Sequence, residues 1–319
     1  LVNILCIWGL FGNVITVIVL IKQQIKGTIT ILLTSIAVFD IVFCVTQLLQ
    51  EAIIILKEYD PVAGGKFLII YMHGIVQWNH LALSSSIYSV AIIGVERLIA
   101  VCFPFLVARI CTPYRTKCLI VLTEVFIFTF TFPEKFLFYE FKWQNNQTVY
   151  TARSWARSAN THLMFYWVYI MPLVQVILPL CVLTACYTVI VVMLRSSSSK
   201  TSKLTPSYAK TSKAKELKMF RLLLALMTFA LLSFSPSVIF SLTLSYGVLY
   251  VDLDHYSFEL VKILTKVCCH VFTSVNFILY VTMCSKFAKS YSELMKCCLP
   301  GQRRNSAKCN VYSKNVLGK

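Results

Sequence analysis

Residues 1–21, LVNILCIWGLFGNVITVIVLI, form an apolar run without a single charged side chain. A helix of about 20 residues is long enough to cross the ~30 Å hydrocarbon core of a bilayer. Further apolar runs of sufficient length follow at 29–56, 67–103, 117–139, 161–194, 217–246 and 258–283. Because backbone polar groups in lipid must be paired within the protein, these seven runs predict seven transmembrane helices.

The composition favours a membrane protein as well. Of the 319 residues 58% are hydrophobic and only 13% are charged, and the mean hydropathy is +0.73, which exceeds what one soluble core could bury. We expect an all-α integral membrane protein: a seven-helix domain over 1–296 that includes a short amphipathic cytoplasmic helix at 285–296, then a cytoplasmic tail over 297–319. Since the chain opens at Leu1 inside an apolar run, we expect an N-terminal tail to precede it.

The net charge of +17 would suggest a nucleic-acid partner in a soluble protein, but its placement argues against one. Basic residues gather in the loops after the first, third and fifth runs and in the C-terminal tail. By the positive-inside rule this face is cytoplasmic, which predicts a multi-pass protein of the plasma membrane with an extracellular N-terminus. The basic stretch 195–221 is either a linker attracted to anionic lipid or a contact for a cytoplasmic protein.

Two modification sites agree with this topology. The sequon Asn146-Gln147-Thr148 falls in a loop on the extracellular side, where N-glycosylation takes place. Cys297 and Cys298 end the amphipathic stretch and are candidates for palmitoylation at the inner leaflet. The alternative for this pair is two unmodified thiols.

Polar residues inside the spans are functional candidates, because each is costly in hydrocarbon without a partner. Asp40 lies in the middle of the second run, and Asn13, Ser86 and Asn276 have comparable depth in three others. Together they predict a hydrated cluster whose oxygens could hold a small cation such as Na⁺ at Asp40. The alternative is that the four bond across helices as packing contacts, at about 0.6 kcal/mol each.

A candidate switch lies near the cytoplasmic face. Arg97 follows Glu96 at the inner end of the third run, and Glu216 precedes the sixth. Pairing of Arg97 with either carboxylate would stabilise a closed state, although snorkelling of the arginine to the interface is the simpler alternative. Pro236 removes a backbone donor from the sixth run, so we expect a kink about which that helix can pivot.

These polar and proline positions belong to motifs that recur in order along the chain, one set for each span except the fourth. The motifs are Gly12-Asn13-Val14, Ala37-Val38-Phe39-Asp40, Glu96-Arg97-Leu98 with Pro104, Pro179 with Tyr187, Phe234-Ser235-Pro236, and Asn276-Phe277-Ile278-Leu279-Tyr280 with Phe287. The ordered set resembles the fingerprints of rhodopsin-family G-protein-coupled receptors. Residues 95–104, 111–116 and 275–280 further resemble invertebrate, molluscan-type chemosensory and FMRFamide-like peptide receptors.

The resemblance implies a receptor that binds an extracellular peptide or small polar chemosensory ligand and activates a heterotrimeric G protein. In that family Arg97 would meet the G protein, Tyr187 and Tyr280 would support it in the active state, and Phe105 would be the hydrophobic knob of the second inner loop. Asp40, Ser86 and Asn276 would line a sodium pocket. Apart from this allosteric Na⁺ we expect no cofactor.

The ligand site should lie about five turns outward of Arg97, or ~27 Å, where Asn79 stands. Amine receptors carry an aspartate there and opsins a lysine at the place of His270, so monoamines and light sensing are disfavoured. The expected pocket residues mix charged, polar and aromatic side chains, which suits a short peptide or a polar small molecule. They are Asn79, His80, Glu134, Phe234, Lys266 and His270. Each has helix packing as its alternative role.

Departures from the family pattern leave other functions open. Glu124 stands near the place of the usual tryptophan in the fourth run, Phe234 replaces tryptophan in the sixth, and Phe277 replaces proline in the seventh. They suggest a receptor-like protein that no longer signals. Charged groups within the spans suggest a transporter or ion channel, which should show paired repeats that this sequence lacks. No nucleophile, metal or phosphate motif indicates an enzyme.

Overall fold

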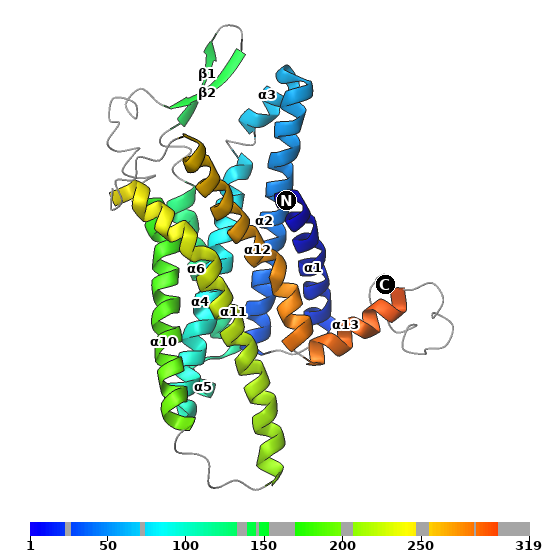
Figure 1. Cartoon of the computed structure of the whole chain (residues 1–319), viewed down its shortest axis with the longest axis vertical. Helices are drawn as coiled ribbons and strands as arrows, with labels where there is room; N and C mark the ends of the chain where they lie inside the picture. The colour runs from blue at the N-terminus through cyan, green and yellow to red at the C-terminus, as the bar shows by residue number, and fades with distance from the viewer. Residues whose placement is uncertain are drawn as a thin grey trace.

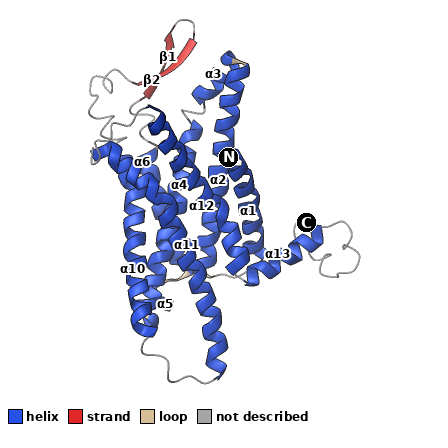
Figure 2. Ribbon diagram, viewed as in Figure 1, coloured by secondary structure: helices blue, strands red, loops and turns tan. Residues whose placement is uncertain are grey.

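The computed structural model describes residues 1–22, 27–70, 74–132, 139–144, 147–152, 170–198, 207–246, 255–283 and 285–298. Long helices run side by side along the length of the molecule (Figure 1). Helix α3 and a β-hairpin lie at one end of this bundle, whereas α5 and α13 lie at the other. Apart from the hairpin, the regular structure in the described part of the chain is helical (Figure 2).

The helices follow the predicted runs in order. They are α1 (Val2–Lys22), α2 (Thr28–Tyr59), α3 (Pro61–Ile70), α4 (Val76–Cys102), α5 (Pro104–Ile110), α6 (Pro113–Thr131), η3 (Leu173–Ile177), α10 (Leu178–Ser198), α11 (Ser207–Tyr246), α12 (His255–Met283) and α13 (Ser285–Cys298). Among the described residues, six helices are long and apolar enough to cross a membrane: α1, α2, α4, η3 continued by α10, α11 and α12. The predicted all-α membrane bundle is therefore confirmed.

Helix α6 corresponds to the fourth predicted run and is not among these six helices. It has 19 residues and carries Arg115, Lys117 and Glu124, so it is less apolar than the six others. It packs against α4 and α2. Helix α1 packs against α2 and α12, α4 against α2 and α10, and α11 against α12. Since α2 and α4 have neighbours on several sides, polar residues in their middle parts, such as Asp40 and Ser86, are buried.

Several boundaries differ from the sequence expectation. The third run, predicted as one helix over 67–103, contains the end of α3 and then α4, which begins at Val76. Helix α3 returns along the end of α2, where Gly64 lies so close to the backbone of Lys57 that a β-carbon would not fit. Helix α11 begins at Ser207, ten residues before the predicted 217, so part of the basic stretch 195–221 is helical.

The fourth run also ends earlier than predicted. Helix α6 stops at Thr131, and Tyr139, the expected last residue of the span, is the first residue of a strand. This strand, β1 (Tyr139–Gln144), pairs antiparallel with β2 (Gln147–Ala152), with Tyr139 opposite Ala152 and Gln144 opposite Gln147. This hairpin was not predicted from the sequence.

The apolar core joins the spans into one body. A continuous cluster of buried side chains includes members from α1, α2, α4, α10, α11, α12 and α13. Helices α1 and α12 approach closely at Gly12, where a β-carbon would lie 2.8 Å from the β-carbon of Phe277. A bulkier residue at Gly12 would push the two helices apart, which explains the glycine in the first motif.

Candidate functional site

The centre of the bundle contains a buried polar cluster formed by three helices. Ser86 Oγ, on α4, donates a hydrogen bond of 2.8 Å to Asp40 Oδ1 on α2, and Asn276 Nδ2, on α12, donates one of 2.7 Å to Asp40 Oδ2. All three side chains are fully buried. Asn13, on α1, instead donates to the carbonyl of Thr273 at 2.8 Å. The structure thus brings three of the four predicted residues into direct contact.

The chemistry of this cluster fits a small cation. The amide oxygens of Asn13 and Asn276 are buried and have no hydrogen-bond partner among the described residues. Within the same part of the chain no cationic side chain forms an ion pair with Asp40. A buried carboxylate with no compensating charge is costly, and hard cations prefer oxygen ligands. Asp40 and Asn276 are therefore the residues that would hold Na⁺.

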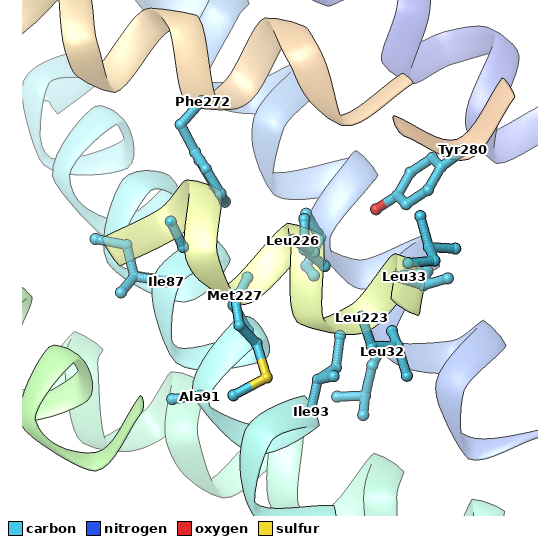
Figure 3. Close-up of a cluster of buried hydrophobic side chains, with 14 of the residues drawn as sticks. Leu32, Leu33, Ile87, Ala91, Ile93, Leu223, Leu226, Met227, Phe272 and Tyr280 are labelled. Carbon is cyan, nitrogen blue, oxygen red and sulfur yellow. The ribbon is translucent and has the colours of Figure 1, made fainter. Parts of the chain in front are cut away.

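An apolar layer lies between the polar cluster and the end of the bundle that contains Arg97. We define it by the side chains that Figure 3 labels around the inner part of α11, which are Leu32, Leu33, Ile93, Leu223, Leu226 and Tyr280. Leu33 and Ile93 are each seven residues from a polar-cluster residue on the same helix, or about 10 Å along it. The phenol oxygen of Tyr280 is buried and has no partner among the described groups. The layer therefore separates the polar cluster from Arg97.

Arg97 and Glu96 lie beyond this layer, near the C-terminal end of α4. The Nη2 atom of Arg97 is 3.7 Å from Glu96 Oε1, and the hydroxyl of Thr28, the first residue of α2, also donates to that oxygen. Arg97 Nε and Glu96 Oε2 are buried without a hydrogen-bond partner in the described part of the chain. Glu216 belongs to α11, but its side chain and any contact with Arg97 lie outside the described residues.

The thiol of Cys111 lies near this pair, in the turn between α5 and α6. Burial, and after it the negative charge of Glu96, raise the pKa of Cys111 above its usual value, against the opposing effect of Arg97. The thiol is therefore held in its neutral form near Arg97. Arg97 has Glu96 as its ion-pair partner among the described residues.

The other residues expected to take part in G-protein coupling lie at the same end of the bundle as Arg97 or along α10 and α11. Phe105 is 96% exposed at the start of α5, as a side chain that contacts another protein would need to be. Tyr187 of α10 accepts a 3.3 Å hydrogen bond from Thr228 of α11. Pro236 lies within the continuous helix α11. The Tyr187–Thr228 bond links α10 and α11, and a hinge at Pro236 stays a prediction.

A second polar group joins α2 and α12 toward the opposite end of the bundle. Lys266 Nζ is 3.0 Å from Glu51 Oε1, and Gln47 Nε2 donates to the same oxygen at 3.1 Å. His270 Nδ1 donates to the carbonyl of Lys266 at 2.7 Å. The Lys266 and Glu51 side chains are 36% and 26% exposed, so both are accessible to a ligand.

Asn79 and His270 lie further into the bundle than this ion pair. Asn79 Nδ2 donates to Thr46 Oγ1 at 2.8 Å, and the ring of Phe43 lies 4.9 Å from that of His270. The Nε2 atom of His270 is buried and has no hydrogen-bond partner among the described residues. Asn79 and His270 therefore both contact the same stretch of α2.

The remaining predicted pocket residues differ in their surroundings. Phe234 is completely buried and packs against Phe272, with ring centroids 4.9 Å apart, so it belongs to the core. His80 is partly buried and takes part in a contact within the described structure. Glu134 lies outside the described residues, as do Asn146 and the side chains of Cys297 and Cys298 at the end of α13.

Sequence reasoning missed several partners. Glu51 was not among the predicted site residues, but it lies on α2 and is the partner of Lys266. Sequence reasoning also gave no explanation for Glu124, whose Oε2 accepts a 2.6 Å hydrogen bond from Ser85 of α4. Phe277 fills space between α12 and α13, with its ring 5.3 Å from that of Tyr291. The signal that could have revealed the Glu51–Lys266 pair is the presence of opposite charges at similar depth in the second and seventh runs.

Comparison with known proteins agrees with this arrangement of helices and motifs. Residues 12–285 match the family described as 7 transmembrane receptor (rhodopsin family). The chain belongs to this family. It is therefore a rhodopsin-family receptor, a class of receptors rather than enzymes, and the predicted resemblance is confirmed.

Two relatives to which the chain is similar are FMRFamide receptors. The receptor is 25% identical to the FMRFamide receptor of Drosophila melanogaster over 309 residues, which cover 91% of this chain and 52% of the relative. It is 24% identical to the FMRFamide peptide receptor frpr-18 of Caenorhabditis elegans over 165 residues, or 50% of this chain and 36% of that protein. The chain thus spans about half the length of the first relative and less of the second.

Proposed function

We propose that this receptor binds a short extracellular peptide of the FMRFamide type and activates a heterotrimeric G protein. It would act in the plasma membrane with its N-terminus outside and its basic face in the cytoplasm. The observation that carries the proposal is the separation of two sites. The accessible Lys266–Glu51 pair lies toward one end, Arg97 lies at the other, and a buried polar cluster and an apolar layer lie between them.

The outer pair suits a peptide that carries a basic side chain. Glu51 bonds Lys266 and Gln47, so a guanidinium group that enters between α2 and α12 can replace Lys266 on a prepositioned carboxylate. Charge-assisted bonds of this type are about twice as strong as neutral ones. His270 and Asn79 are polar groups deeper in the same region that could orient the rest of the ligand.

The inner site suits a mechanism in which agonist binding opens the cytoplasmic end. Pro236 gives α11 a hinge, and Leu223, Leu226 and Met227 on the cytoplasmic side of that hinge fill the apolar core. Outward movement of the inner part of α11 would uncover Arg97, which lies on the neighbouring helix α4. Packed cores of this type have discrete arrangements, so a small shift at the ligand can favour the open one.

The experiment is a nucleotide-exchange assay in cells that express the receptor with a promiscuous G protein. Short peptides ending in Arg-Phe-amide are expected to raise exchange, and Arg97→Ala is expected to abolish most of the response at equal surface expression. Arg115→Ala is the matched control, because Arg115 is an exposed arginine on the same face that binds the carbonyl of Arg109. An unchanged response in Arg97→Ala would contradict the mechanism, whereas peptide binding without exchange on any G protein would indicate a silent receptor.

A further inference from the structure

A groove of about 960 Å³ lies between α1, α2 and α6, away from the residues discussed so far. Its lining comes from the last turn of α1, the first turns of α2 and the first turns of α6. All three helix ends belong to the basic face. Ile21 on α1 and Val38 on α2 line the groove and are exposed side chains. In a membrane these exposed apolar walls are in contact with lipid rather than water.

Two hydroxyl groups of the groove wall, those of Thr34 and Ser35, are satisfied within α2. Thr34 Oγ1 donates to the carbonyl of Thr30 at 2.7 Å. Ser35 Oγ donates to the carbonyl of Leu32 at 2.8 Å. Because these hydroxyl groups bond to backbone carbonyls of α2, the surface that Thr34 and Ser35 present to the groove is largely apolar. Ile21, Val38 and the other aliphatic residues of the lining extend this apolar surface.

Lys117 is the charged residue of the groove lining. Its side chain is exposed, and among the described residues no hydrogen bond, ion pair or other interaction involves it. It lies in the second turn of α6, which begins at Pro113 after the capping residue Thr112. The N-terminal end of a helix carries a partial positive charge, which adds to that of the ammonium group. The groove therefore combines an apolar wall with an uncompensated positive end.

We propose that this groove binds an anionic phospholipid of the inner leaflet, with its phosphate at Lys117 and an acyl chain between α1 and α6. The location rests on the cytoplasmic assignment of the basic face within the proposed function. Anionic lipids are concentrated in the cytoplasmic leaflet, where they attract basic residues. A free phosphate would leave the apolar wall exposed, and a sterol would leave Lys117 without a counter-charge. The phospholipid satisfies both features.

The test uses purified receptor in phosphatidylcholine vesicles that contain a photoreactive phosphatidylserine, or the same photoreactive group on phosphatidylcholine. Peptides from 28–39 and 113–121 are expected to be labelled more strongly by the serine lipid. The expected preference is about fivefold, the factor that corresponds to about 1 kcal/mol for one basic residue near an anionic lipid surface. Equal labelling by the two lipids would overturn the proposal. Agonist and G protein are absent, so the result is independent of signalling.

Matched variants identify the groups responsible. Lys117→Gln should reduce the serine-lipid labelling to the phosphatidylcholine level, while Arg115→Gln should leave it unchanged, because Arg115 binds the carbonyl of Arg109. Val38→Trp should fill the groove and reduce labelling by both lipids, whereas Leu122→Trp, at an exposed position on α6 outside the groove lining, should not. Equal thermal stability of the two tryptophan variants ensures that the comparison reports on the groove.

Three results would contradict the assignment. Labelling that is insensitive to Lys117→Gln would show that the charge has no role. Displacement of the serine lipid by a photoreactive sterol, with strong sterol labelling of the same peptides, would identify a sterol site instead. Displacement by inorganic phosphate in solution would indicate that only the headgroup is recognised. A salt-sensitive preference for phosphatidylserine is the supporting outcome.

Discussion

Asp40 accepts two hydrogen bonds, and one of its donors, Asn276, has an amide oxygen with no hydrogen-bond partner in the described structure. If Na⁺ occupies this site, sodium binding stabilises the folded receptor by RT ln(1 + [Na⁺]/Kd). We therefore expect NaCl to raise the melting temperature of the purified receptor more than choline chloride does at equal ionic strength. Asp40→Asn should abolish this difference, because the charge that attracts the cation is lost. Thermal unfolding in detergent measures both.

Thr131→Val is the control for this experiment. Thr131 is fully buried and bonds within its own helix, to the carbonyl of Ile127, so its replacement alters a buried polar group away from Asp40. This variant should keep the sodium effect. Asp40→Ala would leave the donors of Ser86 and Asn276 without an acceptor, at about 1–3 kcal/mol each if they stay buried. A sodium effect that persists in Asp40→Asn would argue that the cluster is only a packing contact.

Single residues were predictable where the sequence fixes their depth. Counting along alternating spans placed Asp40, Ser86 and Asn276 at the same level, and they are in contact. The same count could not reveal that the amide of Asn13 bonds a backbone carbonyl, because backbone acceptors exist at every depth. Phe234 was expected to line the pocket, but which face of α11 points inward depends on packing, and Phe272 encloses it.

At the scale of elements, the contact between α2 and α12 is the feature that a ligand can alter. A partly exposed ion pair such as Lys266–Glu51 contributes about 0–1 kcal/mol to stability, so its loss should affect folding little. If Glu51 binds the basic side chain of the peptide, Glu51→Gln should lower agonist potency about tenfold or more, the effect of losing a charge-assisted bond of 1.5–3 kcal/mol. Concentration–response curves for nucleotide exchange provide the measurement.

Lys266→Gln should have the opposite effect, because it removes the competing cation and frees Glu51 for the ligand. Potency should then be maintained or increased. Glu58→Gln, which removes an exposed carboxylate two turns further along α2, should change nothing. Equal losses in Glu51→Gln and Lys266→Gln would show instead that the pair holds α2 against α12 and that Glu51 has no separate role in recognition.

Most spans were predictable because each long apolar run has no other stable form in lipid. The boundaries were less so. The apolar residues of α3 were joined to α4, since hydropathy does not register the close approach of Gly64 to Lys57. The hairpin was hidden in a similar way. Its first residue, Tyr139, was counted as the end of a span, and the alternation of Tyr139, Phe141 and Trp143 was not read as the period of two that is typical of strands.

The arrangement of the whole molecule makes a prediction about topology. Helix α3 and the hairpin lie at one end of the bundle, and α5 and α13 lie at the other. The short connection at Asp60, between α2 and α3, should therefore lie on the opposite face from Ser198, the last residue of α10. An epitope inserted at Asp60 should be stained on intact cells, and one at Ser198 only after permeabilisation.

The sequon provides an independent measure of the same topology. Asn146 lies between β1 and β2 in sequence, so it should share the face of Asp60 and receive a glycan, and Asn146→Gln should increase gel mobility. The two measurements are independent of each other. Glycosylation reports which loops enter the lumen of the secretory pathway, whereas staining reports the orientation of the receptor at the cell surface. Staining of both epitopes on intact cells would exclude an odd number of crossings between them. The Lys266–Glu51 pair and Arg97 would then no longer be assigned to opposite sides, and the proposed coupling between them would fail.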